Sequence, residues 1–163
     1  MALSLARLRE LLNYDPETGR FTWRVNGNNG IRKGAIAGCL DQTSGRFRIC
    51  IDRKLHHASR LAVLWMTGEY PPQNVDHANC NPADNRWINL RPASQSQNLG
   101  NMRRPKHNTS GYKGVTWQAG KYIAKLGRRN FYLYLGRFDR AEDAHAAYVA
   151  AAKKYFGEFA RAG

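Results

Sequence analysis

The sequence predicts an α+β protein of two modules: a β-rich N-terminal module with short helices, then a small three-stranded antiparallel sheet with one helix. Short stretches of apolar–polar alternation, separated by turn residues, favour strands over long helices. Charge also changes along the chain, because residues 1–101 hold 13 basic and 8 acidic side chains whereas residues 102–163 hold 13 and 4. We therefore expect modules at 1–101 and 111–163, joined by a basic linker at 102–110.

The N-terminal elements are predicted from spacing and turn chemistry. Leucines at helical spacing predict a short helix over residues 4–12. Residues 15–19 read Asp-Pro-Glu-Thr-Gly, which is typical of a turn, and Phe21 and Trp23 then alternate with polar residues as in a strand. The expected order is thus helix, turn and strand.

A second strand and a second helix follow. Residues 46–51 alternate apolar side chains with Arg46, Arg48 and Cys50, which predicts a half-buried strand with arginine on its open face. Residues 59–66 predict a buried helix that ends at Gly68. The glycine-containing segment 27–38 is loop-like.

The stretch 75–101 is rich in Asn, Asp and Gln, so it predicts a loop-rich site rather than a core. Ser94 and Gln97 have the spacing of a capping box, which predicts a short helix. Asn98 would then lie in the first turns of this helix.

The C-terminal module reads β-β-β-α. Strands are predicted over residues 112–117, 121–126 and 131–135, with Tyr112, Tyr122 and Leu126 in the core. Asp139 is the expected N-cap of the helix and Gly157 its end. Its packing stripe is predicted to consist of Ala144, Ala147, Tyr148, Ala151 and Tyr155. The opposite face of the sheet would stay free for a ligand.

Composition favours a polyanionic partner. The formal net charge is +14, which favours nucleic acid over a membrane, and no apolar run is long enough to span a bilayer. The first twelve residues are too charged for a secretory signal. Three cysteines without a CxxC pair argue against a disulfide framework or a cysteine-built zinc site, so we expect a reducing intracellular compartment.

Asp76 and His77 are the adjacent pair that carries the prediction of chemistry. Neighbouring side chains on a strand point to opposite sides, so one can bind a metal while the other addresses a water molecule. Hydrolysis of a phosphodiester needs such a water, a base with a near-neutral pKa and a cation. A carboxylate and an amide oxygen suffice for Mg²⁺, and an Asn carbonyl can fix the tautomer of the histidine. An isolated Asp-His pair also occurs in ordinary turns, so the prediction depends on the surrounding run of polar residues.

Segment 75–101 resembles the HNH endonucleases of the phage and homing-endonuclease type, which have a ββα-metal fold centred here on about residues 73–101. His77 precedes Asn89 by 12 positions and Asn98 by 21, which are the spacings of the family. The resemblance implies that His77 is the general base and that Asp76 and Asn98 bind the metal. Asn89 would orient His77 and brace the hairpin. Mg²⁺ or Mn²⁺ is the implied cofactor.

The resemblance extends upstream through residues 14–19, 21–24 and 60–68. This chain departs from it with Ser59 where relatives have His, and with Ala-Asn-Cys-Asn at 78–81 in place of a glycine-containing turn.

Two arginines of the HNH-like segment are candidate phosphate contacts. The alternative for Arg86 and Arg91 is pairing with Asp84 or with a backbone carbonyl.

The C-terminal module resembles the APETALA/ethylene-response-factor DNA-binding domain through residues 110–117, 134–138 and 141–151. Such domains lay a three-stranded sheet in the major groove with a helix behind it. The DNA-facing positions that this resemblance implies are Lys113, Thr116, Trp117, Lys121, Lys125 and Tyr134. Core packing is the alternative for Trp117. Lysines stand where plant relatives favour arginine, so base specificity is expected to be relaxed.

Further phosphate contacts are expected from the turns and the linker. Arg128 and Arg129 are predicted to clamp phosphate, and Arg103, Arg104 and Lys106 to lie along it. A merely solvated connector is the alternative for the linker.

The leading prediction is therefore a metal-dependent endonuclease of double-stranded DNA, site-preferring and of the homing type, that acts as a monomer or weak dimer. One active site per chain favours nicking, and the alternative is a double-strand cut by a dimer or by two successive events. No membrane partner is expected, and the expected location is the cytoplasm of a bacterial host, with the gene carried by a phage. The alternatives are a non-catalytic, sequence-preferring DNA-binding regulator with a relic HNH segment, and an RNA-binding module.

Overall fold

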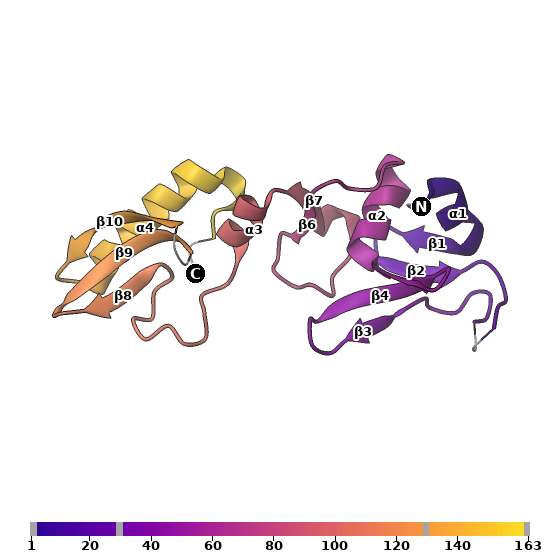
Figure 1. The fold of residues 1–163 in the computed structure, drawn as a ribbon, viewed down its shortest axis with the longest axis horizontal. Coiled ribbons are helices and arrows are strands. Elements are labelled where there is room, and N and C mark those ends of the chain that lie inside the picture. The colour runs from indigo at the N-terminus through magenta and orange to yellow at the C-terminus, as the bar shows by residue number, and fades with distance from the viewer. Residues whose placement is uncertain (1–2, 29–30, 129–130, 162–163) are drawn as a thin grey trace. The chain divides into compact units, whose positions relative to one another are not determined.

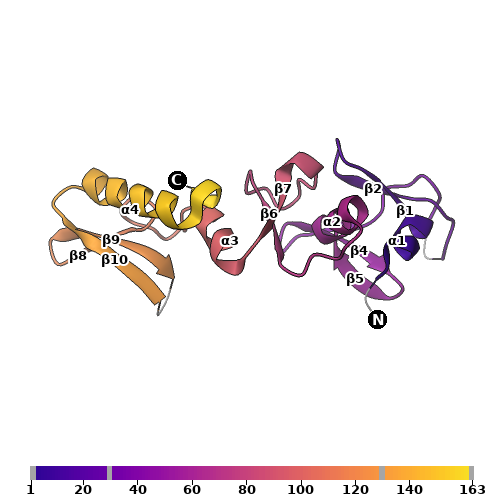
Figure 2. The same ribbon diagram turned by 90° about the horizontal axis from the view of Figure 1, so that it is seen from above.

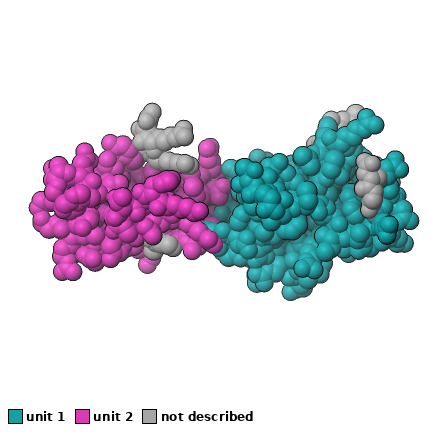
Figure 3. Space-filling view, turned by 90° about the horizontal axis from the view of Figure 1, so that it is seen from below, with its two compact units in different colours: residues 1–93 teal, residues 94–163 magenta. Residues whose placement is uncertain are grey.

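The structure is a computed structural model that describes residues 3–28, 31–128 and 131–161. The chain forms two compact units, unit 1 at Met1–Ala93 and unit 2 at Ser94–Gly163 (Figure 3). The boundary lies earlier than the expected module boundary at residue 101. The reason is that the short helix after the polar stretch packs within unit 2, as described below.

In the part of unit 1 that the structure describes, two α-helices combine with three small sheets (Figure 1). In chain order its elements are α1 (Leu5–Leu11), β1 (Leu12–Asp15), β2 (Arg20–Trp23), β3 (Cys39–Asp41), β4 (Arg46–Ile51), β5 (Lys54–His57), α2 (Ala58–Thr67), β6 (Asn74–His77), the 3-10 helix η1 (Trp87–Asn89) and β7 (Leu90–Ala93). The pairs β1–β2 and β6–β7 are antiparallel hairpins, and β3, β4 and β5 form an antiparallel meander.

The core of unit 1 forms around α2. This helix is apolar on most of its surface, and residues from Ala58 to Leu64 are buried except Arg60. Its core partners include Leu8, Leu12, Phe21, Ile49 and Ile51. The predicted helices at 4–12 and 59–66 are confirmed within one residue at each end, because Ser4 caps α1 and Gly68 ends α2 with a φ of 82°.

The turn between β1 and β2 forms as its residues predict. The Asp15 carboxylate accepts hydrogen bonds from the backbone N–H groups of Glu17 and Thr18. Gly19 closes the turn at a φ of 71°, a conformation that glycine adopts without strain. This turn lies against the loop between β6 and β7, which gives it a part in the site.

Unit 2 is a three-stranded sheet backed by a helix. Its elements are α3 (Gln95–Asn101), β8 (Val115–Gln118), β9 (Lys121–Arg128), β10 (Phe131–Phe138), α4 (Ala141–Phe156) and η2 (Gly157–Phe159). The strand order is β10-β9-β8, all antiparallel, and α4 runs along one face (Figure 2). The β-β-β-α prediction is confirmed. β8 and β9 meet at Ala119 and Gly120, both at positive φ, as the right-handed twist of a tight hairpin requires.

The start and stripe of α4 differ from expectation. Arg140, not Asp139, occupies the N-cap, and no side chain caps the helix. The Asp139 carboxylate is instead paired with the Lys121 ammonium group. Tyr155, predicted to pack, is 60% exposed. The buried residues of the helix are Ala141, Ala144, Tyr148 and Ala152. In the described ranges, no helix is both long and apolar enough to cross a membrane.

Candidate active site

Asp76 and His77 end strand β6, and both are almost fully buried, with 4% and 5% of their surface exposed. Val75 of the same strand packs in the core, which fixes the hairpin to the body of unit 1. Cross-strand register pairs Asp76 with Arg91 of β7. The Arg91 Nε–H donates to Asp76 Oδ2 at 2.9 Å, so the buried carboxylate is held by a charged partner.

The imidazole of His77 faces a second polar side chain. Its Nε2 lies 3.2 Å from the Oδ1 of Asn85, which is itself only 4% exposed. Burial lowers the pKa of His77 below its ordinary value; the Asn85 hydrogen bond opposes this shift and the charge of Arg46 adds to it. The ring is therefore neutral at pH 7, as a general base must be.

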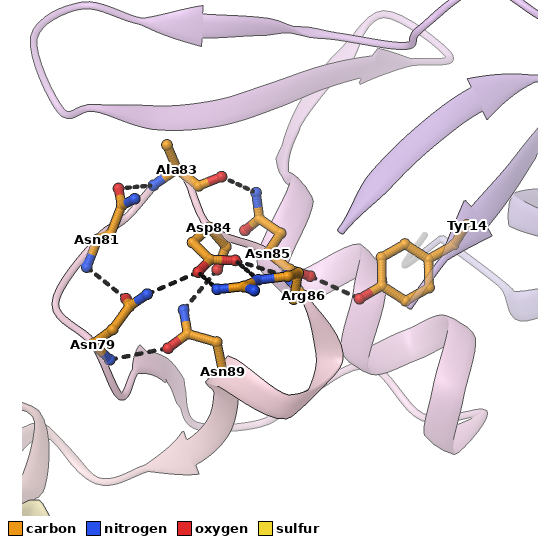
Figure 4. Close-up of polar contacts among 8 residues, drawn as sticks. All are labelled: Tyr14, Asn79, Asn81, Ala83, Asp84, Asn85, Arg86 and Asn89. Atoms are coloured by element: carbon orange, nitrogen blue, oxygen red, sulfur yellow. Dashed lines mark hydrogen bonds and ion pairs between the residues drawn. The ribbon is translucent and has the colours of Figure 1, made fainter. Parts of the chain in front are cut away.

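Asn89 braces the loop between β6 and β7 (Figure 4). Its Nδ2 donates to the carbonyl of Asp84 at 2.8 Å, and its Oδ1 accepts from the backbone N–H of Asn79 at 2.9 Å. The family resemblance gave Asn89 two roles, bracing the hairpin and orienting His77. The structure gives the bracing contacts to Asn89 and an amide contact with His77 to Asn85.

The two arginines of the hairpin are engaged in ion pairs. Arg86 binds Asp84 through two hydrogen bonds, from Nε at 2.8 Å and from Nη2 at 2.6 Å. These bonds hold the pKa of Asp84 at about 2. Pairing of Arg86 with Asp84 was the expected alternative to a phosphate contact. Arg91 also forms an ion pair, but with Asp76, a partner that the sequence did not indicate.

Asn85 and Tyr14 are the residues of this site that sequence patterns missed. The Tyr14 hydroxyl donates to the backbone carbonyl of Asn85 at 2.7 Å, and burial raises the pKa of this tyrosine. Asn85 belongs to a conspicuous Asp-Asn-Arg run, which was the available signal. The spacing alone cannot tell which of several nearby amides faces the histidine.

Asn98, the second predicted metal ligand, lies half-buried in α3 of unit 2. The predicted capping box is confirmed, because the Ser94 hydroxyl accepts from the Gln97 N–H while the Gln97 side chain accepts from the Ser94 N–H. α3 packs closely within unit 2, since a Cβ at Gly100 would lie 2.6 Å from the ring of Phe156.

Lys113 is buried, which corrects the expectation that it occupies a DNA-facing position. It is 7% exposed, and its ammonium group donates to the carbonyls of Gly100 at 2.7 Å and Arg161 at 3.0 Å. A buried ammonium group needs such acceptors, and the last turn of α3 supplies one. Lys113 therefore ties α3 to the rest of unit 2.

The remaining predicted DNA contacts of the sheet fall into two sets. Alternation places Thr116, Lys125 and Tyr134 on the face opposite α4, and Thr116 and Tyr134 are exposed. By the same alternation, Lys121 lies on the face opposite α4, and it forms an ion pair with Asp139. Trp117 lies on the face of the sheet that α4 covers, and 53% of its surface is exposed. The centroid of its ring is 4.5 Å from that of the Tyr122 ring.

The residues after α3 are exposed, including Arg103, Arg104 and Lys106. Arg104 donates to the carbonyl of Asn108. Arg129 lies outside the described residues, as does the side chain of Arg128. Of the predicted core residues, Leu126 is buried whereas Tyr112 and Tyr122 are half-buried.

Comparison with known proteins identifies the segment that contains this hairpin. Residues 56–99 match the HNH endonuclease family. They form an HNH endonuclease domain. The HNH domain begins in β5 and ends within α3, so it contains Asp76, His77, Asn89 and Asn98.

Part of the chain is also similar to a phage protein. The chain is 46% identical over 43 residues to protein 3.8 of Escherichia phage T7. This match covers 26% of the chain and 36% of the T7 protein, so the two share about a third of the relative's length. The resemblance of unit 2 to the APETALA/ethylene-response-factor domain stays a prediction.

Proposed function

We propose that this protein is a divalent-metal-dependent endonuclease that hydrolyses phosphodiester bonds of double-stranded DNA. The observation that carries the proposal is the HNH match over residues 56–99, with the buried Asp76–His77 pair in its hairpin. A neutral histidine next to a carboxylate is the combination that base-catalysed, metal-assisted hydrolysis requires.

The donor chemistry fits a hard divalent cation. Asp76 offers a carboxylate and Asn98 an amide oxygen, and Mg²⁺ or Mn²⁺ takes oxygen ligands while keeping several waters. We propose these two residues as the ligands, a pairing supported by the spacing of the HNH motif. The metal, when bound, would stabilise the negative charge that develops on the phosphate and on the leaving 3′ oxygen.

Residues of the chain itself supply the base and its support. His77 accepts a proton from the attacking water, because its ring is neutral at pH 7. Arg91 orients the Asp76 carboxylate through the 2.9 Å hydrogen bond from its Nε. Asn89 holds the loop in shape by bonding both of its sides.

We assign DNA affinity mainly to unit 2. The face of its sheet opposite α4 presents Thr116, Lys125 and Tyr134, and an antiparallel sheet can enter the major groove. The exposed Arg103, Arg104 and Lys106 add positive charge before the sheet. A basic surface of this kind binds phosphates by releasing counterions.

We extend the proposal to a site-preferring, homing-type enzyme that cuts one strand per event. One HNH domain offers one histidine base, which favours nicking by a monomer, and a separate DNA-binding surface favours site preference. The T7 relative supports a phage enzyme that acts in the cytoplasm of its bacterial host.

The test is cleavage of supercoiled plasmid with Mg²⁺, with and without a chelator. We expect wild-type protein to convert supercoiled to nicked circles, and His77→Ala to lose this activity while binding DNA with an affinity within about twofold. His56→Ala is the matched control, because His56 lies in β5 and contacts Tyr70 rather than the hairpin.

Binding without cleavage by the wild-type protein would favour the non-catalytic regulator. Metal-dependent cleavage by purified His77→Ala would falsify the assignment of the base. Sequencing the cut ends reports strand number and site preference from the same reaction.

A further inference from the structure

Asn85 is a buried amide aimed at the base of the HNH domain. Its Oδ1 lies 3.2 Å from His77 Nε2, and both side chains are at least 95% buried. Neither the motif spacing nor the family resemblance gave Asn85 a role. The geometry of a buried, hydrogen-bonded pair constrains the chemistry of both groups.

The second contact of Asn85 fixes which end of its amide faces the imidazole. Its Nδ2 lies 3.3 Å from the carbonyl oxygen of Ala83, to which it donates (Figure 4). Turning the amide over would bring Oδ1 against that carbonyl oxygen, and two acceptors would then face each other. The orientation with Oδ1 towards His77 is therefore the stable one.

The orientation of the amide determines the tautomer of the histidine. A carbonyl oxygen can only accept a hydrogen bond, so the nitrogen that faces it must carry the proton. In a neutral ring this places the proton on Nε2 and the lone pair on Nδ1. The opposite tautomer would set a nitrogen lone pair against Oδ1 in a buried site.

We propose that Asn85 is a positioning residue that fixes His77 in the Nε2–H tautomer, which makes Nδ1 the nitrogen that takes the proton from the attacking water. The catalytic part of this inference rests on the proposed nuclease function. The tautomer itself does not, because it follows from contacts within unit 1.

The N-terminal hairpin holds Asn85 in place. The Tyr14 hydroxyl binds the backbone carbonyl of Asn85 at 2.7 Å, and the backbone N–H of Trp87 donates to the carbonyl of Pro16 at 2.9 Å. Gly19 packs against the same loop so closely that a Cβ there would lie 2.4 Å from the backbone of Asn85. The β1–β2 turn is therefore a support for the tautomer-fixing amide.

The first measurement is the ¹⁵N spectrum of the His77 ring in the full-length protein, without metal or DNA, at a pH where the ring is neutral. We expect wild-type protein to show the Nε2–H tautomer. Asn85→Ala, which removes the acceptor oxygen, should give a mixture of both tautomers. Asn81→Ala is the matched control, because this exposed residue bonds the same loop at Ala83.

The second measurement is single-turnover cleavage at saturating DNA and Mg²⁺. Loss of orientation should lower the rate of Asn85→Ala about 10- to 100-fold. The affinity for DNA should stay within twofold, because the amide is buried and does not reach the surface. Asn81→Ala should cleave at the wild-type rate.

The two measurements separate this proposal from the proposed function. An Nδ1–H tautomer in the wild-type protein overturns the positioning role, and so does an unchanged tautomer in a folded Asn85→Ala. If Asn85→Ala does not fold, the wild-type spectrum still decides. A wild-type protein with the Nε2–H tautomer but no cleavage would instead contradict the nuclease assignment.

Discussion

Asp84 organises the loop between β6 and β7 through several donors. It receives two hydrogen bonds from the Arg86 guanidinium and one from Asn79 Nδ2 at 2.7 Å. Its backbone carbonyl accepts from Asn89. The guanidinium is the largest influence on the carboxyl pKa, which lies at about 2 instead of near 4. The loop that presents Asn85 thus depends on an ionised Asp84.

Replacing this carboxylate should destabilise the protein in a pH-dependent way. A folded-state pKa below the unfolded value stabilises the fold above pH 4, and the stabilisation is lost as pH falls towards 2. Asp84→Asn should therefore cost about 1 kcal/mol of unfolding free energy at neutral pH and much less near pH 2. Urea unfolding at pH 6, 4 and 2 checks this.

The control for Asp84→Asn is Asp52→Asn. Asp52 also pairs with an arginine, Arg7, but both of these side chains are exposed and such pairs contribute little. A constant difference between Asp84→Asn and wild type across the three pH values would contradict the role of the charge.

Single residues show how far sequence reasoning reaches. Asp76 and His77 could be predicted as site residues because their adjacency and their spacing to Asn89 and Asn98 can be read directly from the sequence. The role of Asn85 could not, since Asn79, Asn81, Asn85 and Asn89 all lie in one loop and only the fold selects the one facing the ring. Cys80 takes a φ of 58° where the family pattern has a glycine-containing turn, so the turn forms without glycine.

Among the elements, the β1–β2 turn is the part whose role depends on tertiary contact. Its own conformation follows from Asp15 and Gly19, as the sequence predicts. Its contact with the loop between β6 and β7 joins residues more than sixty positions apart, and no local pattern reveals such a pairing. The start of α4 is also decided by a tertiary contact. Local preference predicts Asp139 as the N-cap, but its carboxylate binds Lys121 instead.

Crowding at this turn leads to a prediction about glycine. Gly19→Ala combines a left-handed backbone with a Cβ 2.4 Å from the backbone of Asn85 and Arg86, so we expect a loss of roughly 2 to 5 kcal/mol in unfolding free energy. Gly34→Ala is the matched control, because its φ is 84° but nothing lies within 4 Å of the added Cβ. That variant should lose only about 1 to 2 kcal/mol.

Chemical denaturation of both variants measures this difference directly. Equal losses in Gly19→Ala and Gly34→Ala would mean that the turn does not press against the loop. A change of the His77 tautomer in Gly19→Ala but not in Gly34→Ala would link the stability effect to the proposed support of Asn85.

Over the whole chain, the division into units differs from the division into families. The HNH match ends at residue 99, whereas unit 1 ends at Ala93, so the first part of α3 belongs to the HNH domain by sequence and the whole helix to unit 2 by packing. The charge step near residue 101 marks where the net positive charge per residue rises, not where the chain changes units. A count of charges does not separate buried from exposed lysines. Lys113, for example, is counted with the basic residues after position 101, but its ammonium group binds the carbonyl of Gly100 in α3.

Lys125 and Lys113 have different environments in unit 2, so they test whether affinity for DNA depends on direct contacts or on total charge. Lys125 lies on the face opposite α4, with its ammonium 4.5 Å from the centre of the Tyr132 ring, whereas Lys113 is buried on two carbonyls. Both carry one charge, so non-specific attraction would treat them alike. A direct phosphate contact is possible only for a side chain that reaches the surface.

We expect Lys125→Gln to weaken DNA binding and to reduce the slope of log affinity against log salt by about 0.9, the value for one lost phosphate contact. Lys113→Gln should leave that slope unchanged and instead lower the thermal stability of unit 2, because the two carbonyls lose a charged donor. Fluorescence anisotropy over a salt series, together with thermal unfolding, measures both effects. An equal fall in slope for the two variants would show that the long-range field of the protein, not contact across the open sheet face, governs its affinity for DNA.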